Sequence, residues 1–141
     1  MEKVVCDASV VVKWFIEEPF SDKALKLRDK HINGEIRIAA PHLLPFEVLN
    51  ALKYSNLFSK EELRDAALSL SYYGIELYPL KNNFAKITVE IAMDNNITVY
   101  DAAYVALAQI LDTKLYTADK KLIEKLGKNY QGLVIHIANY D

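Results

Sequence analysis

Four acidic side chains, Asp7, Glu47, Asp101 and Asp119, lie where a predicted strand ends or a predicted helix begins. If they converged, two carboxylates about 4 Å apart would repel by roughly 4 kcal/mol at an effective dielectric constant near 20. Such a cluster requires protonation, dispersal or bound cations. Hard cations such as Mg²⁺ or Mn²⁺ suit it, because they take carboxylate oxygens and keep several waters. A cation held in this way activates water and stabilises charge on a phosphoryl oxygen, so the pattern indicates metal-assisted hydrolysis.

Each acid also has a purely structural interpretation. Asp7 and Asp119 can each cap a helix, and Asp101 completes a capping-box pattern that begins at Thr98. Glu47 is different, because its neighbours at helical spacing are mostly apolar and a lone carboxylate is unfavourable among them. Glu47 is therefore the acid that best distinguishes a site from a set of helix caps.

The residues needed for a zinc site or for covalent catalysis are missing. His31, His42 and His136 share no ligand spacing, and Cys6 is the only cysteine. A single cysteine excludes an intramolecular disulfide, and its place in an apolar run predicts a buried structural thiol. No covalent nucleophile stands out, and metal-activated water requires none.

The elements that must position the acids alternate between strands and helices. Apolar, β-branched runs predict five short strands, at residues 4–6, 36–40, 75–80, 114–117 and 133–137. Helical spacing predicts helices at 10–16, 21–33, 43–57, 59–72, 82–93, 98–111 and 119–126. Ser9 is expected to cap the first of these helices, and Asn82 or Asn83 the fifth.

This alternation predicts the fold class and the place of the acids. Strands that are apolar throughout suit a parallel sheet covered on both sides. We therefore expect a three-layer α/β/α domain with a central parallel sheet of about five strands. Sites in such sheets form outside the carboxyl ends of the strands, where the helices also begin. The four acids are predicted to share that rim.

Composition restricts the other possibilities. The 141 residues are 52% hydrophobic and 26% charged, which suits one domain spanning residues 1–141. A net charge of −2 argues against a protein that coats phosphates with a basic surface. The N-terminus lacks the pattern of a secretion signal, and the apolar stretch 102–111 is too short to span a bilayer. The expectation is therefore a cytoplasmic protein without a membrane partner.

Four segments carry a resemblance to a known family. They are Val5-Cys-Asp7-Ala-Ser9, Pro45-Phe-Glu47-Val-Leu-Asn50, Tyr100-Asp101-Ala-Ala-Tyr104-Val-Ala-Leu-Ala108 and Tyr116-Thr117-Ala118-Asp119-Lys-Lys-Leu122. Each segment is weak alone, but all four occur in order and with matching spacing over essentially the whole chain. In these segments the chain resembles the PIN-domain nucleases, and within them the VapC-type toxins of toxin–antitoxin pairs.

The resemblance implies an activity, a cofactor and partners. The acids expected to bind Mg²⁺ or Mn²⁺ and to be catalytic are Asp7, Glu47, Asp101 and Asp119. The residues expected to hydrogen-bond to these acids and orient them are Ser9, Asn50 and Thr117. The substrate would be RNA, cut endonucleolytically by a homodimer. A small VapB-type antitoxin would block the site, with an Arg or Lys replacing the positive charge of the metal.

The residues themselves give weaker indications of binding surfaces. Apolar clusters at 14–16 and 19–20, near the rim, and at 57–58 and 72–73 would usually belong to a core. Their number nevertheless favours an interface. Lys13 and the pair Lys120–Lys121 could contact phosphates, although a solvated surface is the more usual role for such residues.

Three alternatives remain open. A phospho-receiver domain has a similar architecture, but it would place an acidic pair where Asp7 stands alone before Ala8. A haloacid-dehalogenase-like phosphatase would need an acid where Ser9 stands. Neither alternative accounts for Glu47. The third alternative is a catalytically silent PIN-like module that binds RNA or protein, and the intact set of acids counts against it.

Overall fold

Five short strands form one parallel sheet in the computed structural model, which describes residues 1–141. The strands are β1 (Glu2–Cys6), β2 (Ile36–Pro41), β3 (Glu76–Tyr78), β4 (Leu115–Thr117) and β5 (Val134–His136). Their order across the sheet is β3-β2-β1-β4-β5, and every neighbouring pair is parallel. The predicted five-stranded parallel sheet is confirmed.

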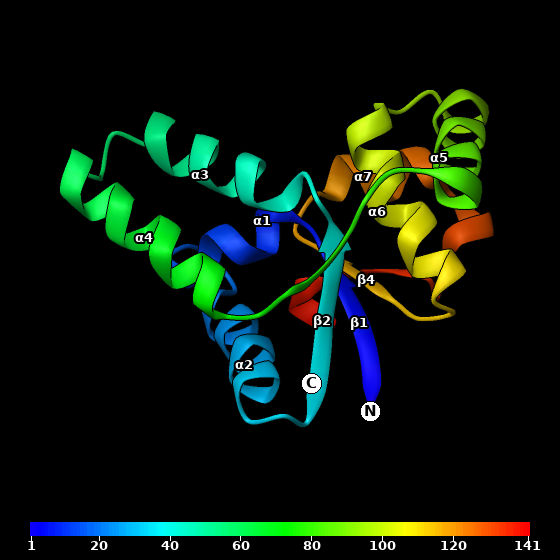
Figure 1. The fold of residues 1–141 in the computed structure, drawn as a ribbon. Coiled ribbons are helices and arrows are strands. Elements are labelled where there is room, and N and C mark those ends of the chain that lie inside the picture. Colours follow the sequence, from blue (N-terminus) through cyan, green and yellow to red (C-terminus); the bar gives the residue numbers. More distant parts are fainter.

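Seven α-helices cover the two faces of the sheet. They are α1 (Ala8–Val11), α2 (Ser21–Ile32), α3 (Leu44–Tyr54), α4 (Lys60–Tyr72), α5 (Asn82–Asn95), α6 (Val99–Ile110) and α7 (Lys120–Leu126). Short 3₁₀ turns follow at Val12–Trp14, Lys128–Tyr130 and Ile137–Asn139. Helices α1 to α4 lie on one side of the sheet and α5 to α7 on the other (Figure 1). The predicted three-layer α/β/α class is therefore confirmed. None of these helices combines the length and the apolar character needed to cross a bilayer.

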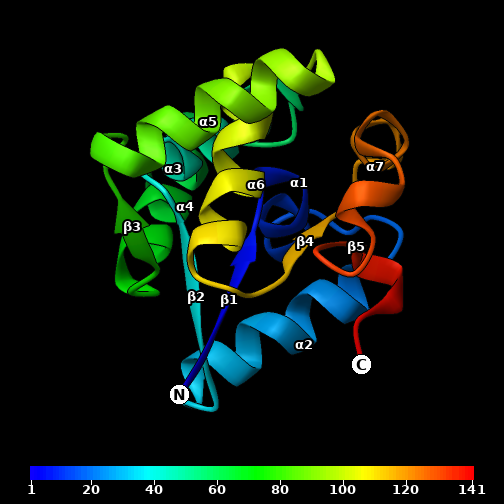
Figure 2. The ribbon, with the colours of Figure 1, turned by 90° about the vertical axis from the view of Figure 1, so that its right-hand side faces the viewer.

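One continuous core covers both faces of the sheet, and α6, which packs on the central strands, is its most buried helix. Residues 102–108 of α6 are all buried, because this helix contacts β1, β2 and β4 on one side and α5 on the other. In Figure 2, α6 runs beside the strands and α5 crosses the upper end of α6. Cys6, at the end of β1, is buried in the core, and burial raises the pKa of its thiol. The prediction of a buried structural cysteine is confirmed.

The strand order reverses direction at β1. The chain leaves β1 for β2 on one side, whereas β4 pairs with β1 on the other side, with Val5 opposite Leu115 and Cys6 opposite Tyr116. Open α/β sheets bind ligands outside the carboxyl ends of the strands at such a switch point. The order also differs from the 2-1-3-4-5 order of flavodoxin-like sheets, to which receiver domains belong. The receiver alternative is therefore excluded.

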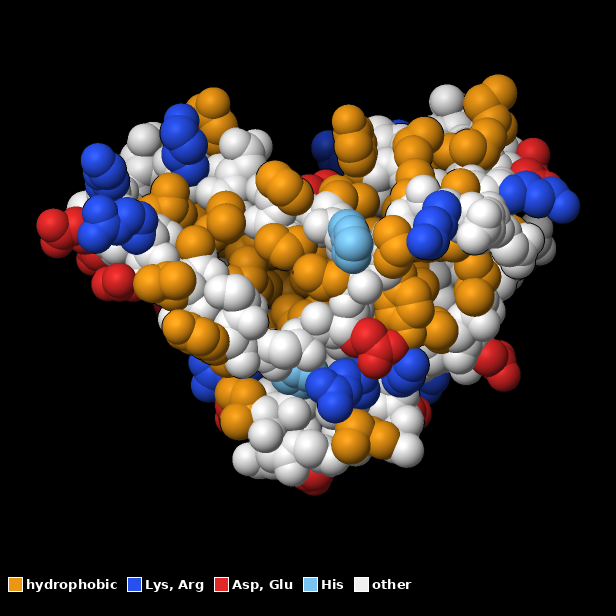
Figure 3. Space-filling view, viewed as in Figure 1, with side chains coloured by type: hydrophobic (Ala, Val, Ile, Leu, Met, Phe, Trp, Pro, Cys, Tyr) orange, Lys and Arg blue, Asp and Glu red, His pale blue; other side chains and the backbone are white.

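Two arms of helices leave a notch above this switch point. The α3–α4 pair forms one arm and α5 to α7 form the other, with both chain termini at the opposite end of the molecule (Figure 1). Figure 3 shows hydrophobic side chains on both flanks of the notch and acidic atoms visible between them. The notch is thus the hollowed face of the molecule on the side where the parallel strands end.

Two predicted helix caps are wrong. Asp7, not Ser9, caps α1, because the Asp7 carboxylate accepts the backbone N–H of Ser9 and the helix begins at Ala8. That helix is also shorter than expected and continues as a 3₁₀ turn from Val12. Neither Asn82 nor Asn83 caps α5, because Lys81 holds the extended cap position and Asn82 is already inside the helix. Both errors shift a helix start by one or two residues and leave the topology unchanged.

Candidate active site

Asp7 lies at the end of β1, where two hydroxyl groups hold its carboxylate. Ser9 Oγ donates to Oδ1 at 2.5 Å, and Thr117 Oγ1 donates to Oδ2 at 2.5 Å. Asp7 is only 7% exposed, and burial raises its pKa to about 6, while the two hydrogen bonds act in the opposite direction. The charge of Asp101 contributes to this raised pKa. Both oxygens are thus oriented by the protein, and Oδ2, which accepts only the Thr117 hydroxyl, keeps a lone pair for another ligand.

The same hydroxyl groups also fix the loop that follows β4. Ser9 Oγ accepts the backbone N–H of Ala118 at 2.9 Å, and Thr117 Oγ1 accepts that of Asp119 at 3.1 Å. The same two hydroxyl groups therefore fix the position of Asp7 relative to Asp119, across the switch point between β1 and β4. The resemblance named Ser9 and Thr117 as residues that orient the acids; these hydrogen bonds are compatible with that role, which stays a prediction.

Glu47, in the first turn of α3, accepts a hydrogen bond from a residue that sequence reasoning did not single out. The hydroxyl of Tyr104 on α6 donates to Glu47 Oε1 at 2.6 Å. Burial raises the pKa of Glu47, the Tyr104 hydrogen bond lowers it, and the charge of Asp101 raises it. Burial and Glu47 together raise the pKa of Tyr104, so its hydroxyl stays protonated and remains a donor. The apolar face around Glu47 thus contains one polar partner.

Asp101 and Asp119 begin two neighbouring helices. Asp101 lies in the first turn of α6, where Thr98 Oγ1 accepts its backbone N–H at 3.0 Å. The return bond of a capping box, from the Thr98 backbone N–H, is absent, and the Thr98 hydroxyl lowers the pKa of the Asp101 carboxyl. Asp119 is the N-cap of α7 and accepts the N–H of Leu122 at 3.1 Å through Oδ1. Helix capping therefore uses one oxygen of Asp119, while the Asp101 carboxylate makes no return bond to the backbone of its N-cap residue.

Asp101 is the electrostatic centre of the four acids. Its charge raises the pKa of both Asp7 and Glu47, and its own pKa is raised by burial and then by Asp119. Three ion pairs occur in the structure, and none involves these four acids. The rim therefore carries mutually repelling carboxylates without a paired cationic side chain, and a divalent cation would relieve that repulsion.

The four carboxylates are nevertheless not gathered into a ready-made coordination shell. No three Asp, Glu, His or Cys side chains lie close enough together to hold one ion. An all-oxygen donor set suits Mg²⁺ or Mn²⁺, which need only one or two direct carboxylates and fill the rest of their shell with water. The donor chemistry fits such an ion, while the spacing favours water between some of the acids and the metal.

A polar hollow of about 400 Å³ lies beside Asp101 and Asp119. Its other lining includes Lys121 and Lys125, which lie one helical turn apart on α7 and are exposed. The positive charge of Lys125 lowers the pKa of Asp101. Lys121 belongs to the lysine pair that the sequence suggested for phosphates. Lys125 was missed, although its spacing of four residues from Lys121 places both on one helix face.

Three other residues that the sequence singled out have different surroundings in the structure. Lys13 is buried and pairs with Glu18 at 3.3 Å, so it is not free to meet a phosphate. Trp14 belongs to the core, where its indole N–H donates to the carbonyl of Ala24. Asn50 is exposed in the same hollow as Glu47 and makes no side-chain hydrogen bond. Its predicted role in orienting an acid stays a prediction.

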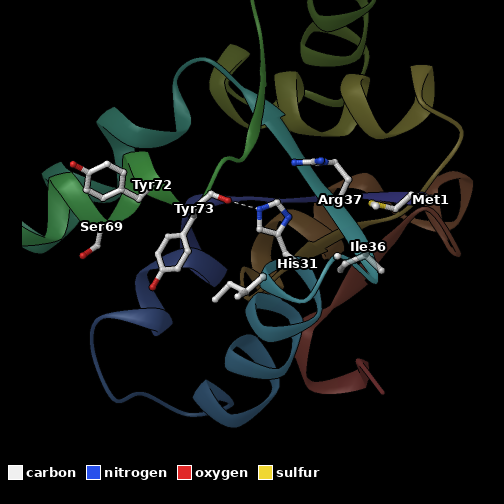
Figure 4. Close-up of a pocket in the computed structure, with 9 residues that line it drawn as sticks. Met1, His31, Ile36, Arg37, Ser69, Tyr72 and Tyr73 are labelled. Carbon is white, nitrogen blue, oxygen red and sulfur yellow. Dashed lines mark hydrogen bonds between the residues drawn. The ribbon is translucent and has the colours of Figure 1, made fainter.

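A larger hollow, of about 600 Å³, lies at the amino ends of the strands and has no acidic residue in its lining (Figure 4). Its buried His31 is a structural link. His31 Nε2 donates to the carbonyl of Tyr73 at 2.6 Å, while Nδ1 accepts the N–H of Ile38 at 3.0 Å. Both ring nitrogens thus join α2, β2 and the end of α4. The four acids lie at the opposite edge of the sheet, where the strands end.

Known proteins resemble this chain over nearly all of its length. Residues 4–129 match the family described as the PIN domain. The chain is 35% identical to "Ribonuclease VapC1" of Mycobacterium tuberculosis over 131 residues, which are 90% of this chain and 93% of that protein. It is 31% identical to "Ribonuclease VapC3" of Pyrobaculum aerophilum over 135 residues, which are 87% and 94% of the two chains.

A solved structure with the same fold is a toxin–antitoxin complex from Klebsiella pneumoniae. The TM-score is 0.64 at 16% identity, and the match covers 95% of this chain and 97% of that chain. At 16% identity, this structural similarity supports the shared fold alone. The family is shown by the match of residues 4–129 and by the sequence relatives.

Proposed function

The chain belongs to the PIN-domain family, and from this premise we propose that it is a metal-dependent endoribonuclease and the toxin of a toxin–antitoxin pair. Two relatives that bear the name ribonuclease match about nine-tenths of the chain. The observation that carries the proposal is the position of Asp101. Its charge raises the pKa of Asp7 and Glu47, and the charge of Asp119 raises the pKa of Asp101. This is the charge pattern that a cation-dependent hydrolase needs.

Asp7, Glu47, Asp101 and Asp119 would hold Mg²⁺ or Mn²⁺, either directly or through water. When bound, the cation supplies Lewis acidity for the attack of water on phosphorus and neutralises charge on the phosphoryl oxygens. The protein supplies orientation, with Ser9 and Thr117 holding Asp7 and Tyr104 holding Glu47. These donors also favour the ionised carboxylates against burial, which keeps them available at neutral pH.

RNA would reach the acids through the polar hollow beside α7. Lys121 and Lys125 line this hollow, and neither forms an ion pair with a carboxylate. Two lysines suit a contact with one or two phosphates, which agrees with a protein of net charge −2. We assign them to the backbone of the bound strand, next to the phosphate being cut.

An apolar groove between α3 and α4 supports a protein partner. A hollow of about 210 Å³ there is lined mainly by aliphatic residues, among them Leu44, Leu49 and Leu70. Leu57 and Tyr72, which the sequence indicated for an interface, are exposed on the same arm. Figure 3 shows hydrophobic atoms in this concave part of the arm. We propose that a VapB-type antitoxin occupies it, and that the toxin itself is a homodimer.

The activity is tested by incubating the purified protein with a panel of RNAs, with Mg²⁺ or Mn²⁺ and with EDTA. Cleavage should require the cation and should be lost in Asp101→Asn while the circular dichroism spectrum is unchanged. The toxin role is tested separately, by co-purification with the product of an adjacent small gene and by loss of cleavage in that complex.

The alternative is a PIN-domain module that binds RNA or protein without cutting. It would be favoured if contaminant-free protein bound the RNA panel and left every member intact with both cations. Equal cleavage by the wild type and Asp101→Asn would instead point to a contaminating nuclease, and the proposed activity would fail.

A further inference from the structure

Two exposed aromatic side chains lie directly beside two of the acids. Phe46 precedes Glu47 on α3, and Tyr100 precedes Asp101 on α6. Phe46 is 78% exposed and Tyr100 is 63% exposed. Both rings line one hollow of about 420 Å³, together with Leu43, Glu47 and Asn50. Because α3 and α6 cover opposite faces of the sheet, the two rings reach this hollow from opposite sides (Figure 1).

The fold does not require either ring. Neither Phe46 nor Tyr100 belongs to the buried core, and the Tyr100 hydroxyl makes no hydrogen bond. Tyr104, four residues further along α6, is buried and bonded, which shows how this helix uses a tyrosine for structure. Single exposed hydrophobic residues are common on protein surfaces. Two aromatic rings that line the same hollow beside two carboxylates are a different pattern, because they offer flat apolar faces where a polar substrate must pass.

We propose that Phe46 and Tyr100 form a stacking site for one unpaired base of the RNA strand, next to the phosphodiester bond that is cut. This inference rests on the proposed ribonuclease function. Aromatic rings bind bases of single strands by stacking, with little dependence on sequence. The polar hollow with Lys121 and Lys125 lies at Asp101 and Asp119, and the aromatic hollow lies at Glu47. A strand crossing the rim therefore meets cations at one end and aromatic faces at the other.

The arrangement also defines the class of RNA. A base can enter between side chains only if it is not stacked within a helix, so duplex RNA is excluded from the aromatic hollow. Single-stranded RNA and loops satisfy the requirement. Phe46 and Tyr100 are thus positioning residues that act on the substrate, and they leave the hydrolytic chemistry to the acids.

The first test is kinetic and uses a mixed-sequence, single-stranded RNA with a fluorophore and a quencher at its ends. Phe46→Ala and Tyr100→Ala should each raise KM by about tenfold with a smaller effect on kcat, as expected for one lost stacking contact. Tyr100→Phe keeps the ring and should recover the KM lost in Tyr100→Ala. The same strand annealed to its complement should be cut at least tenfold less efficiently. Unchanged KM in both alanine variants, or equal cleavage of the duplex, overturns the proposal.

The second test does not depend on turnover. Short-wavelength ultraviolet light joins a stacked base to the ring beneath it, so the same RNA is irradiated with Asp101→Asn. Peptide mapping by mass spectrometry should place the crosslinks at Phe46 or Tyr100, and crosslinks confined to other peptides overturn the proposal. If the wild type cuts no RNA and these crosslinks still form, the stacking site is supported and the proposed ribonuclease function is wrong.

The rings could instead cover a second copy of the chain. Light scattering with size-exclusion chromatography of the wild type, Phe46→Ala and Tyr100→Ala separates this case. An unchanged molar mass supports the stacking site. A lower mass in the alanine variants assigns the rings to a subunit interface and overturns it.

Discussion

The hydroxyl of Tyr104 donates a hydrogen bond to Glu47 Oε1 over 2.6 Å, and this bond joins two helices that cover opposite faces of the sheet. The Tyr104 side chain is 2% exposed, so it is fixed by packing within α6. Glu47 belongs to α3, on the arm that leaves the sheet (Figure 1). The bond therefore sets the position of one acid of the rim relative to the helix that carries another, Asp101.

Removing this hydroxyl should lower both the free energy of unfolding and the rate of RNA cleavage. Tyr104→Phe leaves a half-buried carboxylate without its donor, so we expect the free energy of unfolding to fall by about 1–3 kcal/mol. The pKa of Glu47 should rise, because the lost bond favoured the ionised form. We also expect kcat to fall, by about tenfold if the barrier rises by about 1.4 kcal/mol. Urea denaturation and the pH profile of RNA cleavage measure the two effects.

Tyr100→Phe is the matched control for the stability measurement. It removes a hydroxyl from the same helix, but that hydroxyl is exposed and makes no hydrogen bond. Equal losses of unfolding free energy in the two variants would mean that the bond to Glu47 contributes nothing.

The buried Asp7 should make the metal-free protein less stable as the pH rises. Its pKa is about 6 in the folded protein against a reference value of 3.8, so the folded state binds more protons between these values. The free energy of unfolding should therefore be higher near pH 4 and decrease through pH 6, by about 3 kcal/mol from this group. Unfolding in EDTA at a series of pH values measures it. Asp7→Asn should flatten most of this slope, and an unchanged slope would assign it to other groups.

Asp101→Asn should stabilise the metal-free protein while it abolishes cation binding. The substitution removes a charge that raises the pKa of Asp7 and Glu47, so relief of repulsion should add roughly 1 kcal/mol in EDTA. The wild type should gain stability on addition of Mn²⁺, because a ligand bound only to the folded state shifts the equilibrium. The variant should gain little. Thermal melts with and without the cation record both effects.

Asp65→Asn provides the comparison for that experiment. Asp65 is exposed within α4 and belongs to no ion pair, so its substitution changes the net charge by the same amount away from the rim. The same gain in stability from both substitutions would show that net charge, and not repulsion at the rim, is responsible.

Lys121→Gln and Lys125→Gln should weaken RNA binding more at low salt than at high salt. Each phosphate contact removed should reduce the slope of log affinity against log salt by about 0.7 for a single strand. Fluorescence anisotropy with a labelled RNA in EDTA measures the slope. Lys26→Gln, on α2 and remote from the polar hollow, carries the same charge change. If all three variants lose affinity equally, the lysines of α7 contribute only to net charge.

The fold was predictable because its determinants are local. Apolar strand segments and helical spacing are properties of short stretches of chain, as is the capping box that Ser59 and Glu62 form at the start of α4. The parallel sheet then follows from the alternation of elements. The order β3-β2-β1-β4-β5 was not predicted, since no local pattern determines which strands become neighbours.

The candidate site divides in the same way. The acids could be placed at the carboxyl ends of the strands from the sequence, because a general rule of parallel sheets relates chain position to that edge. The hydrogen bond from Tyr104 to Glu47 was not predicted, because the two residues lie 57 positions apart and the neighbours of Tyr104 on α6 are apolar. The Ser9 cap was wrong because Asp7, two residues earlier, accepts from the Ser9 N–H, while the serine hydroxyl links Asp7 to Ala118.

Both chain ends lie at the amino edge of the sheet, away from the notch (Figure 1). A purification tag, a fluorophore or a surface anchor attached at Met1 or Asp141 would therefore leave the acids facing the solvent. Immobilised protein should accordingly capture RNA or an antitoxin in one uniform orientation. The geometry of the sheet makes this chain suited to sensor-chip binding measurements without re-engineering.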